Sequence, residues 1–490
     1  MSKGPKFNKP SRFTTRDSLG INSVAASIQA ELCPVVNTVT PRAFYWPFMV
    51  WNYYDYLTNV KNAERTVKAF DEPYLKKNDY FFVLSNLITN NPDKYNLVGQ
   101  QKTDTDLHNN QTGPYAYNKD YFVTRYGGMQ YYNAGCLTLG FITDRTDEKK
   151  FDLPRLTREI GEPMARAFEE VIKDTEYYRH YRLSNDPVPY DVLRQFGEVV
   201  TLDLHNFDKC KALMRKALFE PVNNTQLDNR LLIRSAEYAE FIYRDCEAFR
   251  GKGVADFRLE DVREVLFDYY SPSGEHRDHD RSLNDIIMRW EILVGRQYFT
   301  MALELIWKQL MMTLESPMSG NDWLKTTIES SEHQLSLDHP IGEYIPSCNY
   351  TFSERERMIA KGYRETKDTS GNFDTALRLL FSLSNRFSQR EDVDAALLNA
   401  GGDISLTGLF ELINEYQDKS VSDFLQYIIK NWIIAKHQTT ALNKMIYGRD
   451  GYFFERIEGL YSRRVIPSPD FQGIRMMQLM QVMKDLDMLE

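Results

Sequence analysis

The sequence predicts a mainly α-helical, multi-domain protein with a small β-hairpin near its C-terminus. Apolar residues recur at helical spacing through much of the 490 residues, most strongly over 282–315. Hydrophobic residues make up 42% of the chain, which is enough to fill substantial cores. Two short runs of strand-forming residues, at 452–457 and 460–465, flank Glu458-Gly459 as strands flank a hairpin turn.

Polar, proline-containing segments divide the chain. Linkers are expected at 183–190 and 338–353, and the length is typical of roughly two to four domains. The expected parts are a basic tail without fixed structure at 1–16, an aromatic-rich helical domain at 17–187, a middle helical domain at 188–345, and a C-terminal helical domain at 346–490 with its hairpin at 451–465. The tail either solubilises the protein or contacts a partner or nucleic acid.

The N-terminal domain is expected to start with a helix over 19–32. A second helix is predicted from Thr40-Pro41, because Thr is a good N-cap and Pro fits the first helical position. Apolar side chains occupy nearly every face of this second helix, so Trp46 and Trp51 should be largely buried. Pro47 should kink the helix or lie within its first turns.

Segment 90–118 is rich in Asn, Asp, Gln and Gly and is expected to form a long loop. Four glycines leave the structure of 121–142 open, and 153–173 has clear helical spacing. Further helices are expected at 206–219, 227–249, 259–270, 282–315, 372–387, 406–417, 421–447 and 471–489. Five charged residues of the longest helix are not expected all to be buried: Arg289, Glu291, Arg296, Glu304 and Lys308.

The five cysteines lie far apart and form no Cys-x-x-Cys pair, so neither a disulfide framework nor a zinc knuckle is predicted. The N-terminus lacks the apolar core of a secretory signal, and charges interrupt every apolar stretch, so no membrane span is expected. No phosphate-binding glycine loop and no known catalytic motif occurs. We therefore expect a cytoplasmic protein without a cofactor, and the sequence favours a non-enzymatic role.

One loop concentrates residues that bind divalent metals. His276, Asp278 and His279 lie between Glu275 and Asp280, and two imidazoles with three carboxylates are suitable metal ligands. The same loop precedes a long helix, whose N-terminus is stabilised by acidic residues, so helix capping is the alternative interpretation. If the loop does bind metal, the chain is a metal-dependent hydrolase or nuclease with a scattered active site.

A basic, aromatic segment near the C-terminus is the candidate nucleic-acid site. Residues 430–464 carry seven basic and three acidic residues, a local charge of +4 on a chain whose net charge is −9. Basic side chains beside aromatic rings can hold phosphates and stack bases, although a solvated face over a core has the same composition. His437, alone on its predicted helix, is typical of a structural histidine. The candidate phosphate-binding residues are Lys436, Lys444, Arg449, Arg456, Arg463 and Arg464.

Two regions resemble a family of uncharacterised bacterial proteins of similar length. The first region is DSLGI at 17–21 followed by TPRAFYWPFMVWNYYDYL at 40–57. The second is HQTTALNKM at 437–445 followed by a Gly-Arg-Asp and aromatic hairpin at 448–458. The family usually has an Arg-Tyr pair where this chain has Phe44-Tyr45. Members of the family tend to be encoded near helicases and phospholipase-D-like nucleases in antiphage defence islands, so the resemblance implies a role in that setting.

The expected function is therefore a non-catalytic scaffold or nucleic-acid-contacting subunit of a bacterial multi-protein assembly in antiphage defence. The expected partners are other protein subunits, including a helicase or nuclease, and DNA. The metal-dependent hydrolase or nuclease is the alternative from another class. An obligate oligomer with an architectural role is a third.

Overall fold

The computed structural model of the chain describes residues 12–13, 17–37, 41–61, 63–90, 97–121, 128–143, 153–220, 228–245, 259–268, 281–329, 335–348, 372–390, 393–469 and 472–489. The fold is mainly α-helical, as predicted, and the strands of these ranges form only two small sheets. Within the same ranges, no helix combines the length and the apolar character that crossing a bilayer requires.

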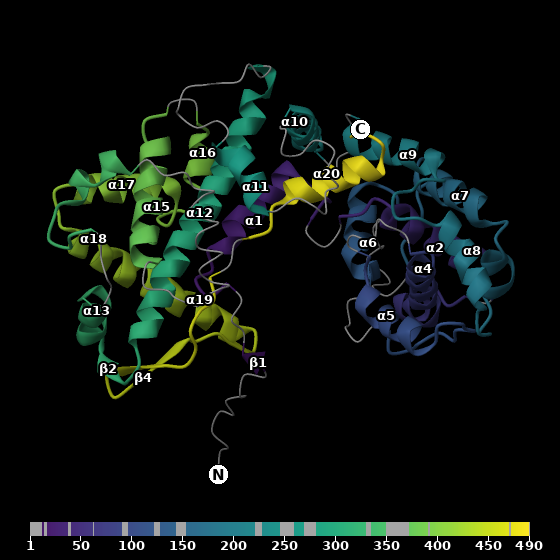
Figure 1. Ribbon diagram of the computed structural model, residues 1–490, viewed down its shortest axis with the longest axis horizontal. Coiled ribbons are helices and arrows are strands. Elements are labelled where there is room, and N and C mark those ends of the chain that lie inside the picture. Colours follow the sequence, from purple (N-terminus) through teal and green to yellow (C-terminus); the bar gives the residue numbers. More distant parts are fainter. Residues whose placement is uncertain are drawn as a thin grey trace, which may run out of the picture. The chain divides into compact units, whose positions relative to one another are not determined.

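The chain forms two compact units, and each unit is built from two separate stretches of sequence (Figure 1). The first unit comprises Met1–Gln29 and Arg258–Gly473, and the second comprises Ala30–Phe257 and Ile474–Glu490. These limits differ from the three consecutive domains expected from linker composition. Linker composition shows only where the sequence is locally polar. Each unit, in contrast, combines two stretches that are distant in the sequence.

In the second unit, α5, α6, α7 and α8 pack on α2 or α4, and α9, α10 and α20 continue the unit beyond α7 (Figure 1). The contacts of α2 are chiefly with α6 and α7, and those of α4 with α5 and α8. The helices are α2 (Tyr45–Asn59), α3 (Val67–Ala69), η1 (Phe70–Leu75), α4 (Lys76–Ile88), α5 (Gln100–Asn109), α6 (Gly128–Thr138), α7 (Gly161–Ile172), η2 (Tyr177–Tyr181), α8 (Tyr190–Val199), α9 (Asp208–Phe219), α10 (Arg230–Asp245) and α20 (Arg475–Asp485).

The aromatic helix α2 is as buried as its sequence predicts. Trp46 is 0% exposed and Trp51 is 1% exposed, and the Trp51 ring stacks on Phe168 at 5.4 Å between centroids. Pro47 lies in the first turn, where a missing N–H breaks no helical hydrogen bond. The predicted start at Thr40-Pro41 is wrong, because the helix begins at Tyr45 and the preceding backbone bonds to another helix instead.

The predicted loop at 90–118 contains a helix, α5, so that expectation is wrong in part. Only Thr103 is buried on this polar helix, so the sequence has no apolar periodicity that would predict it. Tertiary hydrogen bonds hold it instead: the Asp106 carboxylate accepts from the Tyr80 hydroxyl at 3.1 Å and from the Asn118 amide at 2.8 Å. Gly99, with φ of +87°, provides the left-handed residue from which the helix starts.

In the first unit, the 30-residue helix α12 is the central element and packs along α15 (Figure 1). The helices that lie wholly in this unit are α11 (Leu259–Arg263), η4 (Glu264–Asp268), η5 (Arg281–Leu283), α12 (Asn284–Thr313), α13 (Gly320–Glu329), η6 (Ile341–Glu343), η7 (Ile345–Ser347), α15 (Asn372–Phe387), α16 (Ala395–Leu398), α17 (Leu406–Tyr416), α18 (Val421–Tyr427), η8 (Ile428–Ile434) and α19 (Ala435–Ile446). α1 (Asn22–Leu32) contains the chain's first passage from the first unit to the second.

Most of the longer helices were predicted at the right places. α9, α10, α12, α15, α17 and α20 lie within or close to the ranges expected from apolar spacing, and 421–447 forms the continuous run α18–η8–α19. α7 starts at Gly161, eight residues after the expected start at 153. Of the five charged residues of this helix that the sequence analysis named, Arg289 alone is half-exposed, while Glu291, Arg296, Glu304 and Lys308 are buried.

The predicted hairpin is present. β4 (Phe454–Ile457) pairs antiparallel with β5 (Leu460–Arg463), and Glu458 and Gly459 form the turn with φ values of +52° and +85°. Two residues in the left-handed region match the twist of a two-residue hairpin turn. β2 (Met318–Ser319) extends this sheet, and β1 (Arg12–Phe13) pairs separately, in parallel, with β3 (Arg449–Asp450).

A fully buried ion pair links the two stretches of sequence that form the second unit. The Nε and Nη2 atoms of Arg42 each lie 2.9 Å from an oxygen of Asp485, and neither side chain is exposed. The backbone N–H of Ala43 and the side-chain amide of Gln481 complete the carboxylate's contacts at 3.0 and 2.9 Å. The start of α2 and the end of α20 are thereby joined across nearly the whole length of the chain.

Replacing Trp51 by Ala should lower the free energy of unfolding of the second unit by roughly 3–5 kcal/mol, because a buried indole leaves a cavity. Urea unfolding followed by circular dichroism measures this change. Thr58→Ala, an exposed position on the same helix, is the matched control. Equal stability of the two variants would show that α2 does not form the core of this unit.

Arg42→Met should destabilise the second unit by about 3–5 kcal/mol, because it leaves the Asp485 carboxylate buried without its counter-charge. The double variant Arg42→Met/Asp485→Leu should recover much of that loss, because no charge then remains in the apolar interior. Thermal and urea unfolding of the single and double variants measure the difference. A double variant as unstable as the single one would mean that the ion pair is not what limits stability.

Candidate functional site

Helix α19 holds the N-terminal segment 17–21 through one face. His437 Nδ1 donates to the carbonyl oxygen of Ser18 at 3.0 Å, and the Thr440 hydroxyl donates to that of Leu19 at 3.1 Å. Lys444 Nζ donates to the carbonyl of Asp17 at 2.8 Å. The spacing of three and then four residues places the three donors on one side of the helix. The two motifs of the resemblance, DSLGI and HQTTALNKM, therefore meet in space.

The role of His437 in this arrangement is structural. Its second ring nitrogen, Nε2, accepts the backbone N–H of Phe453 at 3.2 Å, so the proton resides on Nδ1 and the ring is neutral. The ring is fully buried and lies 4.7 Å from the Trp307 ring. Burial lowers the pKa of His437 to about 4, because the charged form would lose its hydration. The histidine therefore joins three parts of the first unit and does not face solvent.

The β4–β5 hairpin is attached to α12 and α13. Arg463 Nη1 donates to the carbonyl oxygens of Met311 and Met312, at 3.2 and 3.0 Å. These carbonyls belong to the last turn of α12, where a cation is favoured by the helix dipole. The Tyr461 ring packs against Trp323 at 5.4 Å. One of the candidate phosphate-binding residues is thus a helix cap.

Four of the six predicted nucleic-acid-binding residues already make contacts within the protein. Lys444 and Arg463 bind backbone carbonyls as described, and Arg464 forms an ion pair with Asp450 at 2.8 Å. The Arg456 guanidinium lies 5.4 Å from the centre of a tyrosine ring of β5. Phosphate binding by Lys444 or Arg463 would compete with a contact to the backbone of another segment, whereas Arg456 and Arg464 are exposed.

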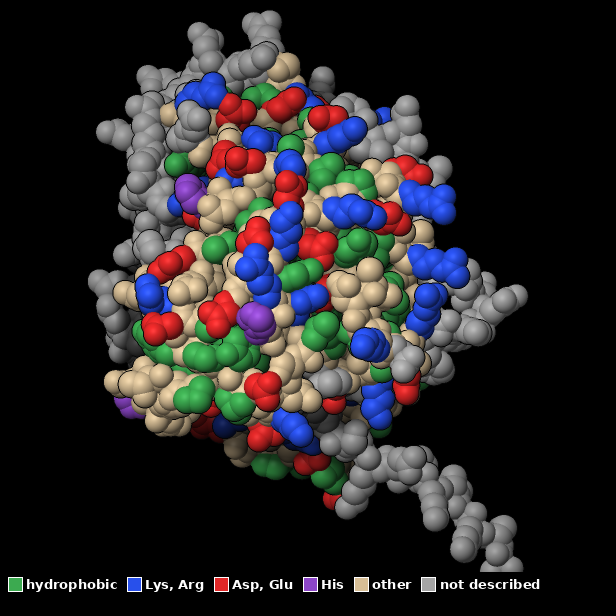
Figure 2. Space-filling view, turned by 90° about the vertical axis from the view of Figure 1, so that its right-hand side faces the viewer, with side chains coloured by type: hydrophobic (Ala, Val, Ile, Leu, Met, Phe, Trp, Pro, Cys, Tyr) green, Lys and Arg blue, Asp and Glu red, His purple; other side chains and the backbone are tan. Residues whose placement is uncertain are grey.

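Lys436 and Arg449 are the two predicted cations for which the described part of the chain provides no partner. Lys436 is half-buried on α19, and Arg449 is exposed at the start of β3. β3 pairs with β1, so the basic N-terminal tail joins the folded chain beside Arg449. On the face of the molecule in Figure 2, by contrast, basic and acidic side chains are intermixed.

The aromatic residues of this region are less available than the sequence indicates. Phe453 and Phe454 are 0% and 3% exposed, and Tyr452 and Tyr461 are half-buried. Tyr447 is the exception, with 83% of its surface exposed. Stacking several bases would require several exposed rings. This region offers one, Tyr447, at the end of α19.

The sequence did not predict that apolar side chains of α19 are exposed. Of the eight large hydrophobic side chains that are exposed in the described residues, seven lie between positions 442 and 466. Leu442, Met445 and Ile446 are 54%, 44% and 72% exposed and lie on the side of α19 opposite the three donors. Tyr447 follows them directly. We call these four residues the α19 apolar stripe. Their helical spacing was visible in the sequence, but periodicity does not tell which face meets solvent.

The metal-binding candidates His276, Asp278 and His279, with Glu275 and Asp280, lie outside the described residues. Within the described ranges, no group of three or more His, Cys, Asp or Glu side chains is arranged to hold a metal. The metal-dependent alternative therefore rests on the sequence alone.

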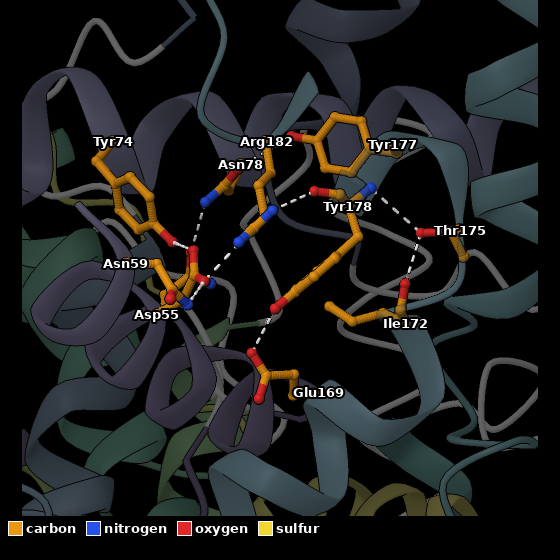
Figure 3. Close-up of polar contacts among 11 residues, drawn as sticks. Asp55, Asn59, Tyr74, Asn78, Glu169, Ile172, Thr175, Tyr177, Tyr178 and Arg182 are labelled. Atoms are coloured by element: carbon orange, nitrogen blue, oxygen red, sulfur yellow. Dashed lines mark hydrogen bonds and ion pairs between the residues drawn. The ribbon is translucent and has the colours of Figure 1, made fainter. Parts of the chain in front are cut away.

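A buried polar network in the second unit is the other concentration of chemical groups (Figure 3). The fully buried carboxylate of Asp55 accepts hydrogen bonds from the Tyr74 hydroxyl, from Asn59 Nδ2 at 2.7 Å and from Arg182 Nε at 3.2 Å. The Arg182 guanidinium also lies 3.7 Å from the Tyr178 ring centre. Both carboxylate oxygens are occupied, so the network stabilises the packing of η2 against α2 and offers no reactive group.

Two buried groups on α4 have shifted pKa values. Burial lowers the pKa of Lys77 to about 8 and raises that of Asp79 to about 7. Such shifts are common in active sites. Here the two residues are two positions apart on a helix and do not face each other. Lys77 donates to the Ser184 carbonyl at 2.7 Å, and Asp79 accepts from the Tyr121 hydroxyl at 3.2 Å, so they do not act as a pair.

The neutral, buried His437 predicts a specific pH dependence. Its folded pKa of about 4 lies below the unfolded value of 6.5, so the unfolded chain binds more protons between these values. Stability is fully present above pH 6.5 and falls as pH decreases. From pH 7 to pH 5, wild type should lose about 2 kcal/mol more than His437→Gln in urea unfolding.

The control for this measurement is His339→Gln, which changes an exposed histidine of the same unit. It should lose as much stability as wild type over the same pH range. If His437→Gln follows the wild-type curve as well, the ring is not held neutral in the folded protein.

Comparison with known proteins gives no relative: no family model, no curated protein and no solved structure matches the chain. The geometry and charge of α19 and the hairpin are therefore the basis for assigning a role.

Proposed function

We propose that the chain is a non-catalytic subunit of a bacterial multi-protein assembly and that it binds a partner protein through the α19 apolar stripe. The single observation that supports this most is the clustering of exposed large hydrophobic residues at 442–466. Exposed aliphatic side chains gathered on one surface are typical of protein–protein contacts. The stripe presents three aliphatic residues at helical spacing and one exposed tyrosine, which suits insertion into an apolar groove.

Charge indicates the kind of partner. Residues 424–449 contain Lys430, Lys436, Lys444 and Arg449 and no acidic residue, although the chain as a whole is acidic. A partner surface with acidic residues around an apolar centre would complement this arrangement. The resemblance to proteins of antiphage defence islands supports a partner encoded beside this chain, of the helicase or phospholipase-D-like nuclease class.

Nucleic-acid contact is the second candidate, and one specific observation favours it. The β1–β3 pairing joins the basic tail to the chain next to Arg449 and close in sequence to the open ring of Tyr447. A basic tail with one aromatic ring can hold a phosphate backbone without reading sequence. The exposed aliphatic residues have no function in such a contact, and for this reason we place the protein partner first.

The double variant Leu442→Ser/Ile446→Ser should weaken binding to the product of a neighbouring gene by at least about tenfold, because two central apolar contacts are lost. Both residues are exposed, so the fold should be unchanged. Co-expression followed by co-purification identifies the partner, and isothermal titration measures its affinity. Gln438→Ala/Asn443→Ala, two exposed polar positions on the same helix, should bind like wild type.

The charge variant Lys436→Glu/Arg449→Glu separates the two candidates. In the protein-docking proposal it should change mainly the salt dependence of partner binding. Mobility shifts with single- and double-stranded DNA at two salt concentrations complete the experiment. DNA binding near physiological salt that this variant abolishes, together with unchanged partner binding by Leu442→Ser/Ile446→Ser, would replace the protein-docking proposal with the nucleic-acid one. Changing Lys444 or Arg463 would not give this answer, because both hold the fold.

A further inference from the structure

Two buried charged residues of α12, Glu291 and Arg296, differ in whether an opposite charge lies beside them. Glu291, which is 2% exposed, is matched by two arginines: Arg386 Nε lies 2.6 Å from its carboxylate, and Arg390 Nη1 lies 2.9 Å from it. Arg296, also 2% exposed, has no such match. Its Nη2 donates to the Ile404 carbonyl at 2.6 Å, while its Nε and Nη1 atoms have no hydrogen-bond partner in the described part of the chain.

The remaining surroundings of Arg296 do not balance its charge. The guanidinium carbon lies 4.8 Å from the centre of the Phe299 ring, which gives a cation–π contact. A Cβ at Gly401, whose φ is +106°, would lie 2.8 Å from Nη2, so the loop backbone closes directly on this group. Among the described residues, no carboxylate forms an ion pair with Arg296.

Two neighbours of Arg296 on the same helix also have unused donors. The Gln297 Oε1 accepts from Arg263 Nε at 3.1 Å, which orients the amide, and its Nε2 has no partner among the described residues. The Thr300 hydroxyl likewise has no partner within the described ranges, and it lies one helical turn from both Arg296 and Gln297. All the unpartnered atoms of these three residues can donate hydrogen bonds, and a second guanidinium, that of Arg263, lies beside them.

A buried guanidinium cannot release its proton to avoid the cost of burial, because its pKa stays far above neutral. Buried charges in proteins are therefore paired or bind ions, since an unpaired one is strongly destabilising. Unpartnered N–H groups and a hydroxyl beside an uncompensated positive charge are the ligands that an oxyanion requires.

We propose that the first unit binds a small oxyanion of the phosphate or sulfate class at Arg296, Gln297 and Thr300. The anion neutralises Arg296 and accepts from its free N–H groups, from the Gln297 amide and from the Thr300 hydroxyl. The unpartnered atoms are all shielded from solvent, so the proposed ligand is a free inorganic ion, because a nucleoside attached to the phosphate would require the helices to separate. This site is independent of the α19 apolar stripe.

The test is thermal unfolding of the dialysed full-length protein with increasing sodium phosphate, at constant ionic strength set with sodium chloride. Wild type should show a saturable rise in the Tm of the first unit of about 2–4 °C. Arg296→Met should show no saturable rise. Without phosphate it should be at least as stable as wild type, because it removes an uncompensated buried charge.

Two controls make the result specific. Arg194→Met, at an exposed arginine of the second unit, should respond like wild type, which corrects for the general stabilising effect of phosphate. Thr300→Val should shift the titration to higher phosphate concentration. ATP in place of phosphate should give no Arg296-dependent rise. An ATP response that Arg296→Met abolishes would overturn the assignment to a free inorganic ion.

The proposal is overturned if wild type and Arg296→Met respond identically to phosphate. It is equally overturned if Arg296→Met is strongly destabilised in phosphate-free buffer, because the guanidinium would then already be satisfied within the protein. Native mass spectrometry provides a second readout, in which wild type retains one bound anion that Arg296→Met lacks.

Discussion

The buried ion pair between Arg42 and Asp485 joins two positions that are 443 residues apart in the chain. Both side chains are fully buried. Removal of either one would therefore leave the other charge unpaired in an apolar interior. The helix that follows Arg42 contributes the most aromatic part of the second core. That core therefore depends on a helix supplied by the last residues of the chain, and the pair fixes the position of one relative to the other.

Helix α19 shows how one element can serve folding and recognition through opposite faces. Its inner face gives three hydrogen bonds to the carbonyls of residues 17–19 and is fully engaged. Its outer face presents the α19 apolar stripe to solvent. Because the inner contacts fix the orientation of the helix, the outer side chains are held in place before a partner arrives. Rigid presentation of this kind reduces the entropy lost on binding.

Local sequence patterns predicted the elements whose stability is local or periodic. α12 and α15 follow from apolar spacing, and the β4–β5 hairpin follows from its turn residues. α5 could not be predicted, because tertiary hydrogen bonds hold it and its own surface is polar. The burial of Arg296 was likewise not predictable, since helical spacing does not say whether the opposite side of a helix is also covered.

The candidate site was predicted only in outline. The sequence located the basic segment and the two motifs, but nothing in it indicated that residues 17–21 and 437–444 would be in contact. It also counted Arg463 and Lys444 as surface charges, because the carbonyls that they bind come from other segments. Contacts between distant segments leave no trace in a local pattern, which is why the division into two discontinuous units escaped the sequence as well.

The discontinuity of both units has a consequence for synthesis on the ribosome. The segment that receives residues 17–19 is translated more than 400 residues later, as the sequence separation of 419 between Ser18 and His437 shows, and the partner of Arg42 later still. A nascent chain that stops before residue 437 can complete neither unit. Such a fragment exposes apolar surface and is open to chaperones and proteases. We therefore expect premature termination to yield fragments that are degraded.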